Sequence, residues 1–178
     1  MRMLDPVEQA LRALAEQHLT LAVAEGDTGG ALLDGLTAVP GSSGVILGGV
    51  VAYHDDLKRS ILGVAPDLLQ RCGAVSAEVA DAMAQGIRHV TGADIGVATT
   101  GIAGPGGATP QKPVGLAFVA AASADNSLVR EHRWQGDRHT NRRASADAAL
   151  RLVLELINST HPNKCATLDA ESGADQCS

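Results

Sequence analysis

Two kinds of apolar pattern alternate along the first hundred residues. Short continuous apolar runs are typical of buried strands, whereas apolar residues that recur every three or four positions are typical of helices. The continuous runs occupy residues 19–24, 44–53 and 94–100, and the helical spacing occupies residues 6–17, 29–39, 57–64, 66–72 and 76–91. The run at 44–53 is too continuous for a strand with one covered face, so we expect it to be covered on both faces. The alternation predicts an α/β fold with a layered sheet.

Residues that start and stop helices support two of these elements. Asp5, Pro6 and Glu8 have the spacing of a capping box with proline at the first helical position. Ser76 and Gly92 have the spacing of an N-cap and a C-terminal stop around the longest of the early helices. We expect that helix to bury one apolar face made of Val79, Met83, Ile87 and Val90.

The second half of the chain predicts an antiparallel pair of strands. A glycine- and proline-rich loop at 101–113 precedes an apolar strand at 114–122, and a short polar turn leads into a strand at 128–134. Loops this long without structure of their own are often functional, so we assign this one to a binding site. A final helix is expected at 139–158. The sheet should therefore be mixed and mostly parallel.

Composition restricts the class of protein. The 178 residues, 45% of them hydrophobic, fit one domain, which we assign to residues 1–160, with a disordered polar tail at 161–178. A net charge of −6 and an aromatic content of 2% argue against a nucleic-acid partner, although a small anion can still bind locally. Three cysteines without metal-like spacing favour a reducing, cytoplasmic compartment. No apolar stretch is long enough for a membrane span or resembles an export signal.

The carboxyl ends of the first three strands are the expected ligand site, because parallel strands bring these ends to one edge of a sheet. Thr28, Gly29 and Gly30 lie in a turn that leads into a helix, where backbone N–H groups bind anions. A plain tight turn explains the same glycines. Asp27 offers a carboxylate and Thr28 a hydroxyl, unless one of them is simply the helix N-cap.

Tyr53 and Lys58 follow the second strand, five residues apart. A tyrosine and a lysine with a lowered pKa can handle protons in hydrolases that use lysine in place of histidine. The alternative is that both are ordinary surface residues, because lysine is nearly always exposed.

Further candidates lie in the glycine-rich loop and at the start of the last helix. Backbone groups of Thr100, Gly101 and Gly104 can line a pocket, and Arg138 and Arg142 can neutralise a phosphate. Lys112 and Arg143 are secondary candidates for the same role. Cations at a helix N-terminus oppose the helix dipole, which favours a nearby anion over simple solvation. His132, His139 and His161 lack the spacing of metal ligands, so we expect no metal and no cofactor.

Six segments in this order resemble the C-terminal domain of the CinA family, which includes stand-alone nicotinamide mononucleotide deamidases. The segments are "AVAEGDTGG", "LTAVPGSSGVILGGVVAYHDDLKRSILGV", "GAVSAEVADAMA", "GADIGVATTGIAGPGG", "KPVGLAFVA" and "GDRHTNRRASADAAL". The resemblance runs from about residue 7 to residue 158. It implies a three-layer α/β/α fold, a homodimer without metal, and a small phosphorylated ligand, a pyridine nucleotide. The implied reaction converts the carboxamide of nicotinamide mononucleotide to the acid and ammonia.

The chain departs from the family pattern at the nucleophile. Active relatives read Ala-Glu-Ser-x-Thr-Gly-Gly, and the serine position is Gly26 here. The resemblance assigns Tyr53 and Lys58 to activation of that serine, and assigns Thr28 with the two following glycines to the oxyanion or phosphate. Glu25 and Gly26 are counted with the ligand-binding turn.

Loss of a serine nucleophile costs on the order of 10⁶ in rate, so the serine mechanism is excluded. Three functions remain open. The first is an amidohydrolase that uses a water activated by Asp27 or Lys58, or the hydroxyl of Thr28. The second is a noncatalytic nucleotide-binding or regulatory protein. The third is a structural dimerisation domain.

Overall fold

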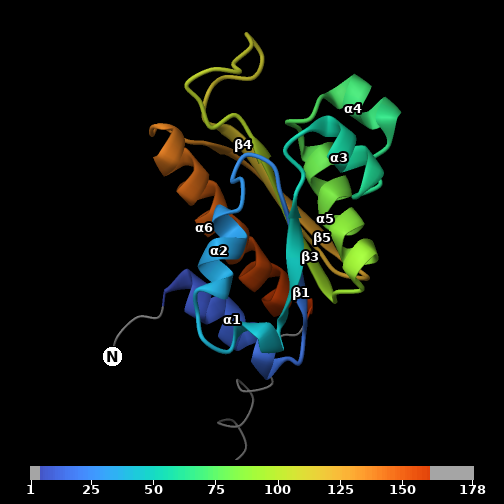
Figure 1. Cartoon of the computed structure of the whole chain (residues 1–178), viewed down its shortest axis with the longest axis vertical. Helices are drawn as coiled ribbons and strands as arrows, with labels where there is room; N and C mark the ends of the chain where they lie inside the picture. Colours follow the sequence, from blue (N-terminus) through green and yellow to red (C-terminus); the bar gives the residue numbers. More distant parts are fainter. Residues whose placement is uncertain (1–4, 161–178) are drawn as a thin grey trace, which may run out of the picture.

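The computed structural model describes residues 5–160 and contains one five-stranded sheet (Figure 1). The strands are β1 (Leu21–Glu25), β2 (Ile46–Val51), β3 (Ile95–Gly101), β4 (Leu116–Ala122) and β5 (Ser127–Arg133). Their order is β2-β1-β3-β4-β5. β1 pairs in parallel with β2 and β3, whereas the β3–β4 and β4–β5 pairs are antiparallel. The prediction of a mixed sheet is confirmed, and the prediction of a mostly parallel one is wrong, because β4 returns directly from a loop without a helical crossover.

Helices lie on both faces of this sheet. They are α1 (Pro6–Glu16), α2 (Ala31–Thr37), α3 (Asp55–Ser60), α4 (Pro66–Cys72), α5 (Ala77–Thr91) and α6 (Arg138–Thr160), with a short 3-10 helix, η1, at Ser42–Gly44. Figure 1 shows α1, α2 and α6 on one side of the sheet and α3, α4 and α5 on the other. Each face has its own apolar core of mainly aliphatic side chains. The chain is therefore an α/β protein with a sheet flanked by helices.

The helix-end signals are confirmed. Asp5 accepts a hydrogen bond from the Val7 N–H and forms the capping box with Glu8 at the start of α1. Ser76 caps α5, and Gly92 ends it in a left-handed conformation. One residue on the predicted apolar face of α5 is misplaced, because Val90 is 57% exposed. The helical period predicts which face of a helix is apolar. It does not predict how far along the helix the neighbouring elements cover that face.

The strand predicted to be covered on both faces is an edge strand. Among the strands of residues 5–160, β2 pairs only with β1, and exposure alternates along it, with Leu47 51% exposed. A continuous apolar run does not distinguish an edge strand from a central one when glycines interrupt the alternation, as Gly48 and Gly49 do here. β1, by contrast, is central and buried at every residue. Its carboxyl end therefore enters the protein interior.

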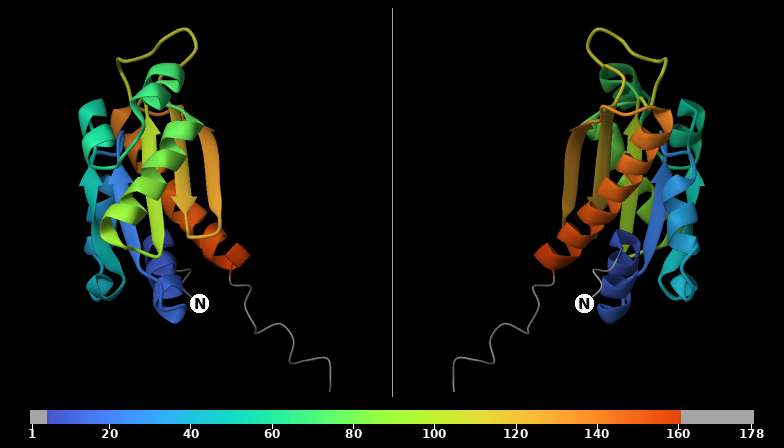
Figure 2. Two further views of the ribbon diagram at one scale, coloured as in Figure 1. Left: turned by 90° about the vertical axis from the view of Figure 1, so that its right-hand side faces the viewer. Right: turned by 90° about the vertical axis from the view of Figure 1, so that its left-hand side faces the viewer.

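The polypeptide after β3 forms a loop that extends beyond one end of the sheet before β4 begins (Figure 2). β1, β2 and β3 all end on the side from which this loop extends. Within residues 5–160, no helix combines the length and apolar character needed to cross a membrane. The polar tail predicted at 161–178 lies outside the described residues.

Candidate functional site

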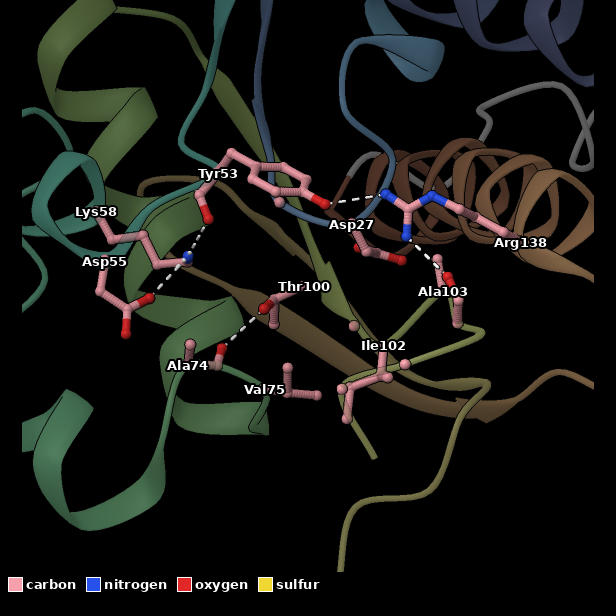
Figure 3. Close-up of a pocket in the computed structure, with 15 residues that line it drawn as sticks. Asp27, Tyr53, Asp55, Lys58, Ala74, Val75, Thr100, Ile102, Ala103 and Arg138 are labelled. Atoms are coloured by element: carbon pink, nitrogen blue, oxygen red, sulfur yellow. Dashed lines mark hydrogen bonds and ion pairs between the residues drawn. The ribbon is translucent and has the colours of Figure 1, made fainter. Parts of the chain in front are cut away.

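A cavity of about 260 Å³ lies where β1, β2 and β3 end (Figure 3). Its walls come from the three segments that the strand order was expected to bring together, from the residues before α5 and from the start of α6. We call it the open pocket; its lining residues are Gly26, Asp27, Tyr53, Asp55, Lys58, Ala74, Val75, Thr100, Gly101, Ile102, Ala103, Gly104, Gly106, Gly107 and Arg138.

Lys58 is buried in the wall of the open pocket. Only 3% of its surface is exposed, although lysines usually lie at the surface. Its ammonium is 3.0 Å from the Asp55 carboxylate and 3.5 Å from the Tyr53 carbonyl oxygen. Both partners come from the start of α3 or the residues before it, so this short helix holds the lysine beside the cavity. The alternative that Lys58 is an ordinary surface residue is therefore wrong.

Arg138 closes the opposite side of the open pocket. Its guanidinium donates to the Tyr53 hydroxyl at 2.9 Å and to the Gly104 carbonyl at 2.9 Å. Tyr53 is itself 61% exposed, so its ring forms a rim and not a buried wall. The two contacts place a positive charge at the entrance and join three segments that are distant in the sequence.

Gly26 lines the open pocket and has little free space around its Cα. Its N–H donates to the Thr99 carbonyl oxygen at 2.8 Å. A Cβ atom placed on Gly26 would lie only 2.9 Å from that same oxygen and 3.4 Å from Thr100 Cα. Since both contacts are with backbone atoms, any side chain at this position requires the ends of β1 and β3 to shift apart.

Asp27 presents a buried carboxyl to the open pocket. It is 8% exposed, and its Oδ1 atom has no hydrogen-bond partner among residues 5–160. Burial raises the pKa of Asp27, and the Ser145 and Thr99 hydroxyls oppose that shift. A Cβ on Gly101 would lie 2.8 Å from Oδ2, so glycine at that position lets the carboxyl pack closely against β3.

The Glu25 carboxylate accepts hydrogen bonds from the backbone N–H groups at the start of α2. Its Oε2 accepts from the N–H groups of Gly30 at 2.9 Å and Leu32 at 3.1 Å, and its Oε1 accepts from Leu33 at 2.9 Å. The N-cap residue is Gly30, which has φ +101° and makes no side-chain cap. The backbone donors that the sequence offered to an external anion are thus bound to a buried glutamate.

The remaining residues of this turn are also internally paired. The Thr28 and Thr99 hydroxyls are 2.8 Å apart and buried. Arg142 donates to the Thr28 carbonyl oxygen from Nε at 2.9 Å and from Nη2 at 2.6 Å, and reaches the Gly29 carbonyl at 3.4 Å. We call Glu25, Thr28, Gly29 and Gly30, together with Arg142, the closed turn.

The predicted site residues therefore fall into two groups. The open pocket includes Gly26, Asp27, Tyr53, Lys58, Thr100, Gly101, Gly104 and Arg138 among its walls. The closed turn contains the other five predicted residues, and none of these lines the open pocket. Neither Asp27 nor Thr28 is the N-cap of α2.

Several residues that shape the site were missed by sequence reasoning. Asp55 pairs with Lys58 and has the i, i+3 spacing of a helical ion pair, a signal that was available. Asn141 and Ser145 are buried polar residues one helical turn apart on α6, and Asn141 donates to the Ala103 carbonyl at 3.1 Å.

Lys112, a secondary anion candidate, donates instead to the Cys72 carbonyl. Over residues 5–160, no three His, Cys, Asp or Glu side chains lie close enough to hold a metal ion.

A family model described as the CinA C-terminal domain matches residues 4–157. A CinA-like protein from Thermotoga neapolitana is 50% identical over 143 residues, which cover 80% of this chain and 35% of that protein. Another from Desulfotalea psychrophila is 46% identical over 142 residues, with 80% and 34% covered. The chain thus spans about a third of the length of these curated relatives.

Solved structures share the fold over most of both chains. The competence/damage inducible protein CihA from Agrobacterium tumefaciens superposes with a TM-score of 0.80 at 37% identity, covering 89% of this chain and 99% of that one. A CinA superfamily protein from Klebsiella pneumoniae superposes with a TM-score of 0.83 at 29% identity, covering 88% and 99%.

Proposed function

The chain belongs to the CinA family through its C-terminal domain, and from that premise we propose that it binds a pyridine nucleotide in the open pocket. Nicotinamide mononucleotide is the expected ligand, as the resemblance of the sequence to nicotinamide mononucleotide deamidases implies. The proposal includes the absence of serine-dependent hydrolysis, with the position of the family's serine occupied by Gly26.

The charges of the open pocket suit a small phosphorylated ligand. Lys58 and Arg138 carry the positive charges of its walls, and Gly106 and Gly107 add backbone groups that a ligand can approach closely. The cations lie on opposite sides of the cavity, so a zwitterionic ligand with one phosphate can meet one cation and leave the other for its second polar end. The closed turn, whose donors are bound to Glu25, contributes no anion site to this proposal.

The chemistry of the lining residues carries the proposal that serine-type hydrolysis is absent. None of the described residues that line the open pocket is a serine or a cysteine. Its two side-chain hydroxyls belong to Thr100, which donates to the Ala74 carbonyl at 2.7 Å, and Tyr53, which is bonded to Arg138. The Thr28 hydroxyl is paired with Thr99 outside the cavity. A covalent acyl intermediate therefore has no well-placed oxygen or sulfur on which to form.

A second candidate function is hydrolysis by a directly activated water. The observation that favours it is the buried Asp27 carboxyl, whose raised pKa is typical of a general base or acid. In this reaction the Asp27 carboxylate takes a proton from water as the water oxygen attacks the carboxamide carbon. The protonated carboxyl then returns that proton to the nitrogen, so that the C–N bond breaks and ammonia leaves.

One experiment separates these functions. Binding of nicotinamide mononucleotide is measured by calorimetry, and ammonia release is measured on the same samples. Binding without ammonia release supports the proposal, whereas turnover that Asp27→Asn abolishes supports the water mechanism. Absence of both binding and ligand-induced thermal stabilisation favours a structural dimerisation domain.

Gly26→Ser tests whether the serine alone is missing. Because its Cβ would meet the Thr99 carbonyl, Gly26→Ala is the matched control for the added atom. Ammonia release by the serine variant, with none by the alanine variant, supports an intact pocket that lacks only its nucleophile. Loss of nucleotide binding in both variants shows instead that β1 and β3 cannot separate enough to admit a side chain.

The proposal also includes a cytoplasmic homodimer, as expected from the resemblance and the cysteine usage. Light scattering coupled to size-exclusion chromatography tests the oligomeric state, with a monomeric mass as the contradictory result.

A further inference from the structure

Asn141 is a buried amide on α6 that does not line the open pocket. It is 1% exposed, and both ends of its side chain are paired with backbone groups. Its Nδ2 donates to the Ala103 carbonyl oxygen at 3.1 Å, and its Oδ1 accepts from the Gly136 N–H at 3.0 Å. These bonds fix which way the amide faces, because only its nitrogen donates and only its oxygen accepts. Asn141 therefore joins two stretches of backbone that are distant in the sequence.

Both of these stretches lead directly to Arg138. Gly136 lies two residues before it, and Ala103 precedes Gly104, whose carbonyl oxygen accepts from the Arg138 guanidinium. Within residues 5–160, the bonds from Arg138 and Asn141 are the two hydrogen bonds between the first turn of α6 and this loop. The Asn141 amide therefore sets the distance that the arginine side chain has to span.

Arg138 itself is exposed, so packing does not hold its side chain. A long exposed side chain loses conformational entropy when it is held in one geometry, and its bonds to Gly104 and the Tyr53 hydroxyl form only where the backbone places them within reach (Figure 3). The Asp137 carboxylate caps the same end of α6 by accepting from the Thr140 N–H at 2.7 Å, but this bond is local and does not reach the loop. The buried amide one turn along the helix supplies the restraint between the helix and the loop.

We propose that Asn141 is a positioning residue of the open pocket: it holds the Ala103 carbonyl and the first turn of α6 in place, so that Arg138 reaches Tyr53 at the entrance. Asn141 does not touch a ligand, and it acts on ligand affinity through the arginine. This inference rests on the proposed function only in that last step, the effect on nucleotide affinity. The earlier step concerns the protein alone and is tested without a ligand.

The single tyrosine of the chain provides the ligand-free readout. Its hydroxyl accepts from Arg138, so the NMR signal of the labelled ring carbon that bears the hydroxyl reports this contact. Asn141→Leu keeps a side chain of similar size and removes both backbone bonds. We expect this variant to move the Tyr53 signal toward the position that the signal has in Arg138→Met.

Asp94→Ala is the matched control. The Asp94 carboxylate also accepts two hydrogen bonds, from the Thr20 N–H at 2.8 Å and the Thr20 hydroxyl at 2.7 Å. Both residues lie just before strands whose other ends form the open pocket, so the control weakens the fold at the opposite end of the sheet. Asp94→Ala should lower the midpoint of urea unfolding and leave the Tyr53 signal unchanged.

Asn141→Ser keeps the test available if the leucine variant does not fold. The serine oxygen lies about one bond short of both amide atoms, so it cannot bridge the two backbone groups as the amide does. It should move the Tyr53 signal in the same direction as Asn141→Leu. Circular dichroism and urea unfolding establish that each variant is folded.

Calorimetry with nicotinamide mononucleotide measures the effect on affinity. Asn141→Leu should weaken binding by about tenfold in the wild-type chain and by less than about twofold in Arg138→Met, because the effects of residues that act through one another are not additive. Asp94→Ala should leave the affinity within about twofold, since it lies far from the pocket.

The outcomes separate this inference from the proposed function. A Tyr53 signal that stays in place in the folded Asn141 variants, or that moves equally in Asp94→Ala, overturns the positioning role and leaves the proposed function intact. An equal affinity loss from Asn141→Leu in both backgrounds overturns the route through Arg138. A wild-type protein that does not bind the nucleotide overturns the proposed function, whereas a displaced Tyr53 signal in the Asn141 variants still supports the positioning of Arg138.

Discussion

Residues 25–30 contribute to both the closed turn and the open pocket, yet the polar groups of this segment have opposite surroundings. Glu25 has three backbone donors on its carboxylate, and the Thr28 carbonyl has two bonds from Arg142. Between them, Asp27 has an unpaired oxygen and no cation. Both carboxylates are buried, so burial alone does not identify a binding residue. The difference lies in whether the protein supplies the partners.

This difference separates residues that maintain the site from residues that face a ligand. A buried polar group with a full set of partners stabilises the fold, and its removal leaves those partners unpaired. A buried polar group with unused capacity costs stability until a ligand arrives, which is common at functional sites. Substitutions in the two regions should therefore change different quantities.

Glu25→Ala should produce the largest effect, on stability. It leaves three N–H groups at the start of α2 without their acceptor, and each such loss costs about 1–3 kcal/mol. We expect the free energy of unfolding to fall by about 3 kcal/mol or more, measured by urea denaturation followed by circular dichroism.

Glu25→Gln sharpens this prediction, because the amide keeps one oxygen and should lose less stability than the alanine variant. Glu16→Ala is the control: Glu16 is an exposed partner of Arg12 on α1, and its removal should change stability by less than about 0.5 kcal/mol. A small effect of Glu25→Ala would show that water or another group satisfies the start of α2.

Lys58→Met should lower the affinity for nicotinamide mononucleotide. The methionine keeps the apolar stem and removes the ammonium from the wall of the open pocket, so the expected loss of affinity for nicotinamide mononucleotide is roughly 30- to 100-fold. Calorimetry measures it. Arg59→Met, which changes an exposed cation next to Lys58 in the sequence, should leave the affinity within about twofold. Equal losses in the two variants would indicate a general charge effect and not a contact in the pocket.

Arg142→Met tests whether the closed turn can be weakened without changing the open pocket. Loss of the guanidinium bonds to the Thr28 carbonyl should lower the free energy of unfolding by about 1–2 kcal/mol. Nucleotide affinity should fall less than about threefold. The exposed neighbour Arg143 provides the control variant Arg143→Met. An affinity loss as large as that of Lys58→Met would mean that the phosphate reaches the closed turn.

Sequence patterns predicted the elements that carry the site, and the reason is local. The capping box at Asp5, the Ser76 cap and the Gly92 stop depend on residues within one helical turn of each other. The convergence of three strand ends follows from the parallel β1, β2 and β3. Patterns failed where the answer depends on neighbours in space, as with β2 at the sheet edge and Val90 at the exposed end of α5.

The candidate site was predicted as a set of residues but not as two regions. The sequence around Glu25 contains glycines and polar residues suited to an anion, and nothing in that spacing shows that the glutamate itself occupies the helix donors. Likewise, Arg142 is separated from the turn by more than a hundred residues, so its contact with the Thr28 carbonyl depends on how α6 packs. A local pattern indicates which polar groups are available, whereas the tertiary fold decides which remain unpaired.

Asp27→Asn should give the smallest effect and reverse the usual direction, by stabilising the protein. Because burial raises the pKa of Asp27 above its ordinary value of 3.8, the folded state holds the proton more tightly than the unfolded state does. Wild-type stability should therefore decrease as pH rises from about 4 through the raised pKa, and the asparagine variant should lack this loss. We expect the variant to be more stable by about 1 kcal/mol at pH 7.5, with the advantage shrinking as pH falls toward 4.

Urea unfolding of both proteins between pH 4 and pH 8 measures this difference, with Asp34→Asn as an exposed control for removal of one charge. If the wild-type protein instead gains stability over the variant as pH rises, the carboxylate has a favourable partner in solution, and the contrast with Glu25 disappears. If the variant is more stable, the buried Asp27 carboxyl costs stability in the folded protein. That result would place the difference between Glu25 and Asp27 in the number of hydrogen-bond donors that the protein supplies to each.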